Sequence, residues 1–188
     1  MRYLFILLFL STTLQISFAQ SHAEKKLLQF AIAKGNILYN EKVRDYDINQ
    51  VREALNKDTL FDWKYTALHE KYGLPDSLVF VLTKAEKIFI NKQLDEMKGF
   101  TWKKHLFKNS LAVNFEAMSA YRKAHGGKLS FNPEDYKNGG YAFTKPILIR
   151  NNTIGFIYVT GRDEGKVLMY VKDKNQWKIK YMLEFWVS

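Results

Sequence analysis

The sequence predicts an α+β fold in which N-terminal helices pack on one face of a C-terminal four-stranded antiparallel meander. Apolar residues recur at intervals of three and four over the first part of the chain, as they do along one side of a helix. Near the C-terminus they alternate with polar residues, as they do in a half-buried strand. Helical patterns that precede all the strands are typical of an α+β layer arrangement.

The composition indicates a single folded domain. Of the 188 residues, 47% are hydrophobic and 15% are aromatic, which is enough apolar surface for a core. We expect this domain to span 20–188, with its helical part at 22–125 and its sheet part at 141–188. Cysteine is absent, which excludes a disulfide scaffold, a thiol nucleophile and a cysteine zinc site.

Residues 1–19 predict a signal peptide. Arg2 precedes an apolar run at 3–10, and Ser17 and Ala19 place small residues where a signal peptidase reads the chain. The alternative is an uncleaved membrane anchor, but polar residues after the run keep it well below the roughly 20 residues that cross a bilayer. We therefore expect an exported protein, periplasmic or secreted, with no membrane span after cleavage.

The first helices are predicted from apolar spacing and capping residues. One helix begins at Ala23 and reaches Tyr39, with an interruption at Gly35-Asn36. Asp47 is expected to cap a second helix and Asp62 a third. The buried face of the second helix is expected to consist of Ile48, Val51, Ala54 and Leu55.

Thr83 and Glu86 predict the clearest helix start, because a threonine followed three residues later by glutamate forms a capping box. Gly99 stands where this helix would end. Beyond it, 111–115 is expected to be extended and 116–124 helical. The apolar face of the capped helix is expected to hold Ile88, Phe89, Leu94 and Met97.

The strands of the meander are separated by turn residues, with short turns predicted at Asn151-Asn152 and at 173–176. The first strand covers 141–150, and Pro146 confines it to an edge or a bulge because proline has no N–H for the ladder. Ile154–Thr160 is apolar on both faces and is expected to be central, and 167–171 is the third strand. The last strand, 177–187, is expected to bury one face made of Trp177, Ile179, Tyr181, Leu183, Phe185 and Val187.

Four short motifs follow one another in this C-terminal region. They are Phe143-Thr144-Lys145-Pro146-Ile147, Gly165-Lys166-Val167, Asn175-Gln176-Trp177-Lys178-Ile179 and Phe185-Trp186-Val187-Ser188. In these motifs, and more loosely over 83–102, the chain resembles an uncharacterised family of exported proteins of Bacteroidetes-type bacteria. The resemblance implies export and the fold, and it brings no catalytic residues. Some members carry a cysteine pair near the 161–165 connection, and this chain has none.

No motif for catalysis or metal binding is complete. His69-Glu70 begins the metalloprotease pattern, but Gly73 stands where its second histidine would be. His105 and His125 lie among basic residues, which oppose a cation, so we expect no metal and no cofactor. Asp163-Glu164, between two glycines, is the most suggestive carboxylate pair, although adjacent carboxylates more often form solvated surface.

The formal net charge is +10, and most of the basic excess lies in the sheet half. One hypothesis is a binding face for a polyanion such as an acidic glycan or lipid headgroups, with nucleic acid a less favoured partner. The alternative is that lysines keep an exposed sheet face soluble and discourage edge pairing. The candidate ligand-binding residues are Lys145, Arg150, Arg162, Asp163, Glu164, Tyr170, Lys178 and Lys180, with Lys172 and Trp186 beside them.

Together these observations predict an exported, non-catalytic binding or interaction module. The alternative is a hydrolase that acts on a cell-envelope substrate in a cleft between helices and sheet. A concave pocket with convergent polar groups and a carboxylate of shifted pKa would favour the enzyme. A filled core beneath a flat basic face would favour the binding module.

Overall fold

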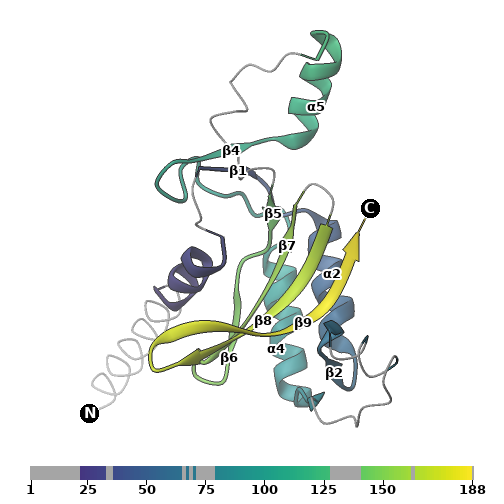
Figure 1. Ribbon diagram of the computed structural model, residues 1–188, viewed down its shortest axis with the longest axis vertical. Helices are drawn as coiled ribbons and strands as arrows, with labels where there is room; N and C mark the ends of the chain where they lie inside the picture. Colours follow the sequence, from purple (N-terminus) through teal and green to yellow (C-terminus); the bar gives the residue numbers. More distant parts are fainter. Residues whose placement is uncertain are drawn as a thin grey trace, which may run out of the picture.

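The computed structural model describes residues 22–32, 36–64, 67, 70, 79–127, 141–161 and 164–187. Over these residues the α+β class is confirmed, because helices and a mainly antiparallel sheet share one hydrophobic core (Figure 1). The signal peptide predicted at 1–19 lies outside the described residues. His69, Arg162 and Asp163 lie outside them too.

The sheet is an antiparallel meander, as predicted. Two short strands, β5 (Ala142–Phe143) and β6 (Ile147–Ile149), share one edge of the sheet. They are followed across the sheet by β7 (Ile154–Thr160), β8 (Glu164–Asp173) and β9 (Gln176–Val187). All neighbouring strands pair antiparallel. β7 has a partner on both sides and is buried along its whole length, so its predicted central position is confirmed.

The predicted first strand is divided at 144–146. Both of its halves pair with β7, but Pro146 has no N–H to add to the ladder between them. Thr144 spans the gap, because its N–H donates to the Tyr158 carbonyl and its Oγ1 accepts from the Tyr158 N–H, each at 3.1 Å. The strand is thus interrupted while the neighbouring backbone keeps its hydrogen bonds.

Both short turns predicted within the meander are confirmed. Asn151 and Asn152 have φ values of 55° and 60°, a left-handed conformation that asparagine tolerates. Lys174 and Asn175, with φ values of 44° and 67°, join β8 to β9 as a two-residue hairpin. Two successive positive φ values match the right-handed twist of the strands on either side.

The predicted alternation along the last strand is wrong in part, because β9 contains two bulges. In the pairing of β8 with β9, Lys180 and Leu183 are extra residues that have no partner on β8. Each extra residue reverses which side chains share a face of the sheet. Tyr181, opposite Met169, is thereby turned to the other face from Trp177 and Ile179, which stand opposite Lys172 and Tyr170. Ile179 and Val187 are 58% and 66% exposed. The buried members of the predicted face are Trp177, Tyr181 and Leu183.

Two helices cover one face of the sheet (Figure 1). α2 (Asp45–Asn56) packs along β7, β8 and β9, and α4 (Lys84–Glu96) packs against α2 and β6. The face predicted for α2 is confirmed, as is the capping box at the start of α4. On α4 the residues that point inward are Ile90, Leu94 and Met97, which helical periodicity places on one line. Ile88 and Phe89 are exposed, so the face predicted for α4 is partly wrong.

Residues 22–32 form a helix on the opposite face of the sheet, so the prediction that all helices share one face is wrong. Gly155 lies against Leu27 of this helix, whereas the next residue along β7 points to the side covered by α2 and α4. Phe30 makes an edge-to-face contact with Tyr170, the cross-strand neighbour of Gly155, at a centroid distance of 6.1 Å. At this point the sheet therefore lies between helix 22–32 on one side and α2 and α4 on the other.

A pair of parallel strands adjoins the antiparallel meander. β1 (Ile37–Asn40) pairs with β4 (Ser110–Val113), and Tyr39 also bridges to Tyr141. The helix predicted to reach Tyr39 therefore does not do so, because Ile37, Leu38 and Tyr39 form a continuous buried run that suits a strand. β2 (Leu60–Phe61) and β3 (Val79–Phe80) form a short antiparallel pair. α5 (Phe115–Ala124) follows β4, as predicted, and projects from the body (Figure 1).

Asp47 does not cap α2. The N-cap is Arg44, and Asp47 lies in the first turn with its side chain fully buried. Asp62 fits its predicted capping role better, because its Oδ1 accepts a hydrogen bond from the Lys64 N–H at 3.3 Å. The same oxygen accepts from the Met182 N–H at 3.2 Å, which ties this segment to β9.

Candidate functional site

The sheet residues predicted to bind a ligand are largely paired with other side chains. The Arg150 guanidinium bonds Glu86, with Nε 2.7 Å from Oε1. The Lys178 ammonium lies 2.7 Å from Oδ2 of Asp173. Lys172 lies on the other face of the sheet from Lys178, because Lys178 pairs with the residue that precedes Lys172. These cations do not form one continuous face.

The three other sheet candidates that the structure describes are Glu164, Tyr170 and Lys180. Glu164 forms an ion pair with Lys166. Tyr170 is 1% exposed, and burial raises the pKa of its hydroxyl, so it cannot stand among the exposed lysines. The ammonium of Lys180 lies 5.7 Å from the ring centroid of Tyr181.

A pocket of about 360 Å³ opens between three segments that are distant in the sequence. Helix 22–32 supplies one wall, 102–107 supplies the second, and the interruption between β5 and β6 supplies the third. Of the predicted ligand-binding residues that the structure describes, Lys145 alone lines this pocket. The lining residues are Glu24, Lys25, Leu28, Trp102, Lys103, His105, Leu106, Phe107, Lys145 and Pro146.

The pocket carries an excess of positive charge. Lys25, Lys103 and Lys145 bring three ammonium groups to it, against the single carboxylate of Glu24. Among the described residues, no ion pair engages any of the three lysines. The Lys145 ammonium lies 5.0 Å from the ring centroid of Phe100, which is a cation–π distance. These charges remain available to an anion.

Trp102, one of the residues that line the pocket, carries an unpaired hydrogen-bond donor. Its side chain packs against Phe100 and Phe143, at centroid distances of 5.0 and 4.9 Å, and is 8% exposed. Within the described part of the chain, its indole Nε1 is the one buried side-chain nitrogen or oxygen without a hydrogen-bond partner. Because buried donors are nearly always paired, this N–H is an unusual feature of the pocket wall.

The second wall is held in place by hydrogen bonds. The Tyr39 hydroxyl donates to the Lys103 carbonyl and accepts from the Leu106 N–H at 3.0 Å. Burial raises the pKa of this hydroxyl, which keeps it protonated as a donor. Nδ1 of His105 lies 2.8 Å from the Ser110 carbonyl and must donate to it, because a carbonyl oxygen can only accept. This wall is preorganised before any ligand arrives.

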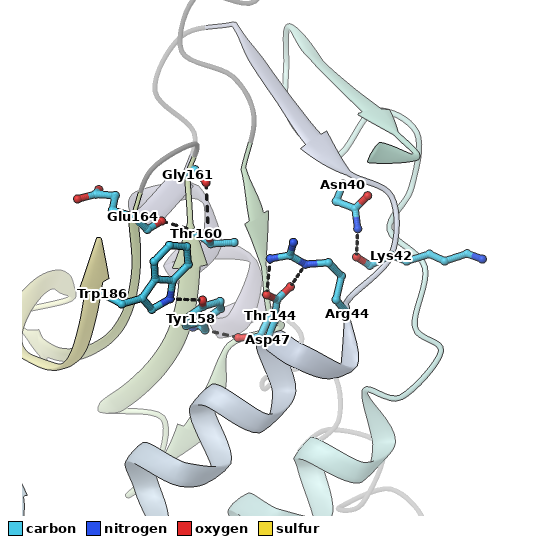
Figure 2. A network of polar contacts seen from close by, with 10 residues as sticks. All are labelled: Asn40, Lys42, Arg44, Asp47, Thr144, Tyr158, Thr160, Gly161, Glu164 and Trp186. Carbon is cyan, nitrogen blue, oxygen red and sulfur yellow. Dashed lines mark hydrogen bonds and ion pairs between the residues drawn. The ribbon is translucent and has the colours of Figure 1, made fainter. Parts of the chain in front are cut away.

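The carboxylates with shifted pKa values lie away from this pocket. Figure 2 shows Asp47 bound by Arg44 through two hydrogen bonds of 2.6 and 2.9 Å. Burial raises the pKa of Asp47, while the hydrogen bonds from Arg44 oppose that rise. A carboxylate that is fully buried and held by two hydrogen bonds at the start of α2 stabilises the fold there, and it has no surface on which to meet a substrate.

Metal ligands do not gather in the part of the chain that the structure describes, since no group of three or more His, Asp or Glu side chains is close enough to hold an ion. His125 instead stacks on Tyr121 at a centroid distance of 3.9 Å. Among the described helices, none is long and apolar enough to span a membrane.

Sequence reasoning missed most of this site. Lys25 and Lys103 belong to segments that no periodicity connects, and only the fold brings them to Lys145. The available signal was the tryptophan–lysine pair at Trp102, where an aromatic side chain precedes a cation outside any regular element.

Comparison of the chain with protein-family models, with curated proteins and with solved structures finds no match.

Proposed function

We propose that this chain is an exported, non-catalytic binding protein that takes an anionic ligand in the pocket between helix 22–32, 102–107 and 144–146. The convergence of Lys25, Lys103 and Lys145 carries the proposal. Ammonium groups without acid partners at a concave site raise the local concentration of anions, whereas paired groups neutralise one another. Export rests on the signal peptide predicted at the N-terminus and on the family resemblance of the C-terminal motifs.

The pocket takes the place of the sheet face as the proposed site for an acidic partner. The sheet cations Arg150 and Lys178 already have carboxylate partners, whereas the pocket lysines have none among the described residues. An acidic glycan stays within the proposed ligand class if a single acidic sugar enters the pocket.

The test is a titration of ¹⁵N-labelled protein with inorganic phosphate at low ionic strength, because salt screens interactions between exposed charges. We expect the amide signals of Lys103 and Lys145 to move and to saturate. The triple variant Lys25→Gln, Lys103→Gln, Lys145→Gln should bind phosphate about tenfold more weakly or worse, since it loses the three charges at the pocket.

The matched control is the triple variant Lys172→Gln, Lys178→Gln, Lys180→Gln. It removes the same charge from the sheet and should bind phosphate as the parent protein does. If the control loses phosphate as strongly as the pocket variant, binding follows net charge and the proposal is wrong. Failure of the parent protein to bind phosphate at low salt would also overturn it.

A further inference from the structure

We infer that the ligand of this pocket is a small aromatic carboxylate, bound as one molecule per chain. The inference rests on the proposed function and adds the size and chemistry of the ligand. Three properties of the pocket support it: its volume, the mixture of polar and apolar residues in its walls, and the unpaired donor carried by one lining residue.

The volume favours a small molecule over a polymer. About 360 Å³ lies at the small end of the roughly 300–1,000 Å³ of small-molecule pockets, so the pocket suits a small compound. A polymeric anion would instead need cations that continue along the surface beyond the pocket. On the sheet, Lys166 and Lys178 are occupied by Glu164 and Asp173.

The apolar residues in the pocket walls favour a ligand that contains a flat apolar ring. Leu28, Trp102, Phe107 and Pro146 line the pocket together with the lysines, and Phe107 keeps part of its surface exposed. Leu28, Trp102 and Pro146 are largely buried already, whereas inorganic phosphate would leave the exposed part of Phe107 in water. An aromatic ring would cover it, because flat rings stack well on a phenyl face.

The hydrogen-bond donors of the pocket favour a carboxylate as the head group of the ligand. A carboxylate has two oxygens with about four acceptor positions, so it can accept from lysine ammonium groups and from another N–H at once. Trp102 carries a buried indole N–H that has no partner among the described residues. A neutral acceptor could satisfy this donor, but it would leave the charges of Lys25, Lys103 and Lys145 unmatched.

The experiment compares five probes by NMR titration at low ionic strength: 2-naphthoate, 2-naphthalenemethanol, acetate, inorganic phosphate and digalacturonate. The alcohol keeps the ring without the charge, and acetate keeps the carboxylate without the ring. We expect 2-naphthoate to bind one to one, about tenfold tighter than the alcohol or acetate. The indole N–H signal of Trp102, identified as the one missing from Trp102→Phe, should move with 2-naphthoate.

Each outcome separates this inference from the proposed function. If phosphate or digalacturonate binds in a lysine-dependent way and 2-naphthoate binds no tighter than acetate, the inference is wrong and the proposed function stands. If the alcohol equals 2-naphthoate, the site recognises rings without charge and the carboxylate is wrong. If none of the five probes binds, both fall. An unmoved Trp102 indole signal at saturation overturns the assignment of this donor, while the comparison of the five probes is read in the parent protein and needs no variant.

Discussion

The indole N–H of Trp186 donates a 2.9 Å hydrogen bond to the hydroxyl oxygen of Tyr158 across an intervening strand (Figure 2). Tyr158 lies on β7 and Trp186 on β9, and the bond passes over Gly165 of β8. A Cβ at Gly165 would lie 2.2 Å from the indole nitrogen and 2.5 Å from the hydroxyl oxygen. The absence of a side chain at Gly165 is what lets the two aromatic residues meet.

Gly165→Ala should therefore destabilise the protein by about 1–3 kcal/mol, the usual cost of forcing an extra methyl group into a packed site. Urea denaturation followed by circular dichroism measures this change. The matched control is Gly161→Ala, where the nearest atom to the new methyl group would be 3.9 Å away. The control should change the free energy of unfolding by less than about 0.5 kcal/mol. Equal losses in the two variants would contradict the close contact at Gly165.

Tyr158→Phe should cost about 1–2 kcal/mol, because it leaves the Trp186 N–H without its acceptor. Trp186→Phe in the same background removes the stranded donor. The second substitution should therefore cost less in Tyr158→Phe than in the parent protein, and a double-mutant cycle measures the difference. Strictly additive losses would show that the bond contributes nothing to stability.

Gly155→Ala tests the position of helix 22–32. The new methyl group would lie 2.2 Å from Cδ2 of Leu27, which is fully buried and must move. We expect a loss of about 1–3 kcal/mol in urea denaturation. In a Leu27→Ala background the same substitution should cost less, since the space it needs has been vacated. An equal cost in both backgrounds would mean that the helix does not press on this face.

Glu86→Gln should lower stability in a pH-dependent way. The hydrogen bond from Arg150 lowers the pKa of Glu86 from 4.5 to about 2, and the bonds to Thr83 add to this. Because the folded protein holds this proton more weakly than the unfolded chain, the stabilisation is complete above pH 4.5 and is lost as the pH falls towards 2. Glutamine can still serve in the capping box, so the variant chiefly loses the ion pair.

We expect Glu86→Gln to be about 1 kcal/mol less stable at pH 7, a modest figure because solvent screens the Arg150 side of the pair. The difference from the parent protein should shrink at pH 3 and approach zero near pH 2. Urea titrations of both proteins at each pH measure it. Burial shifts the pKa of Asp47 upward, with the opposite pH dependence, but this effect is common to both proteins and cancels. A difference of the same size at pH 3 and pH 7 would exclude the ion pair as its source.

Phe156→Ala should be the most damaging of these substitutions, at about 3–5 kcal/mol, because the ring is fully buried at the centre of β7. It also contacts Phe80, with centroids 6.4 Å apart. A loss below about 1 kcal/mol in denaturant would be incompatible with a central strand at this position.

The local parts of this fold could be predicted because neighbouring residues determine them. The capping box depends on Thr83 and Glu86 alone, and the asparagine turn depends on two residues that tolerate positive φ. The alternation of β9 fails where the strand meets its neighbour, because the extra residues Lys180 and Leu183 are defined only by the pairing with β8.

The layer arrangement and the pocket depend on longer-range contacts. Nothing near Leu27 in the sequence tells which face of the sheet it will cover, since the amphipathic pattern is the same for either face. The pocket required Lys25, Lys103 and Lys145 to be brought together from three segments. Only Lys145 was predicted, and it was assigned to a face that the structure does not form.

The parallel pairing of β1 with β4 has a consequence for how the chain acquires its shape. The meander closes through turns of a few residues, whereas β1 must find a partner that lies far along the chain, with Ile37 opposite Ser110. Distant contacts carry a larger entropic cost and form more slowly. Tyr39 of β1 also holds the pocket wall through Lys103 and Leu106. During refolding, the local hairpins of the meander would form first, and the pocket wall would form only in a later, slower phase.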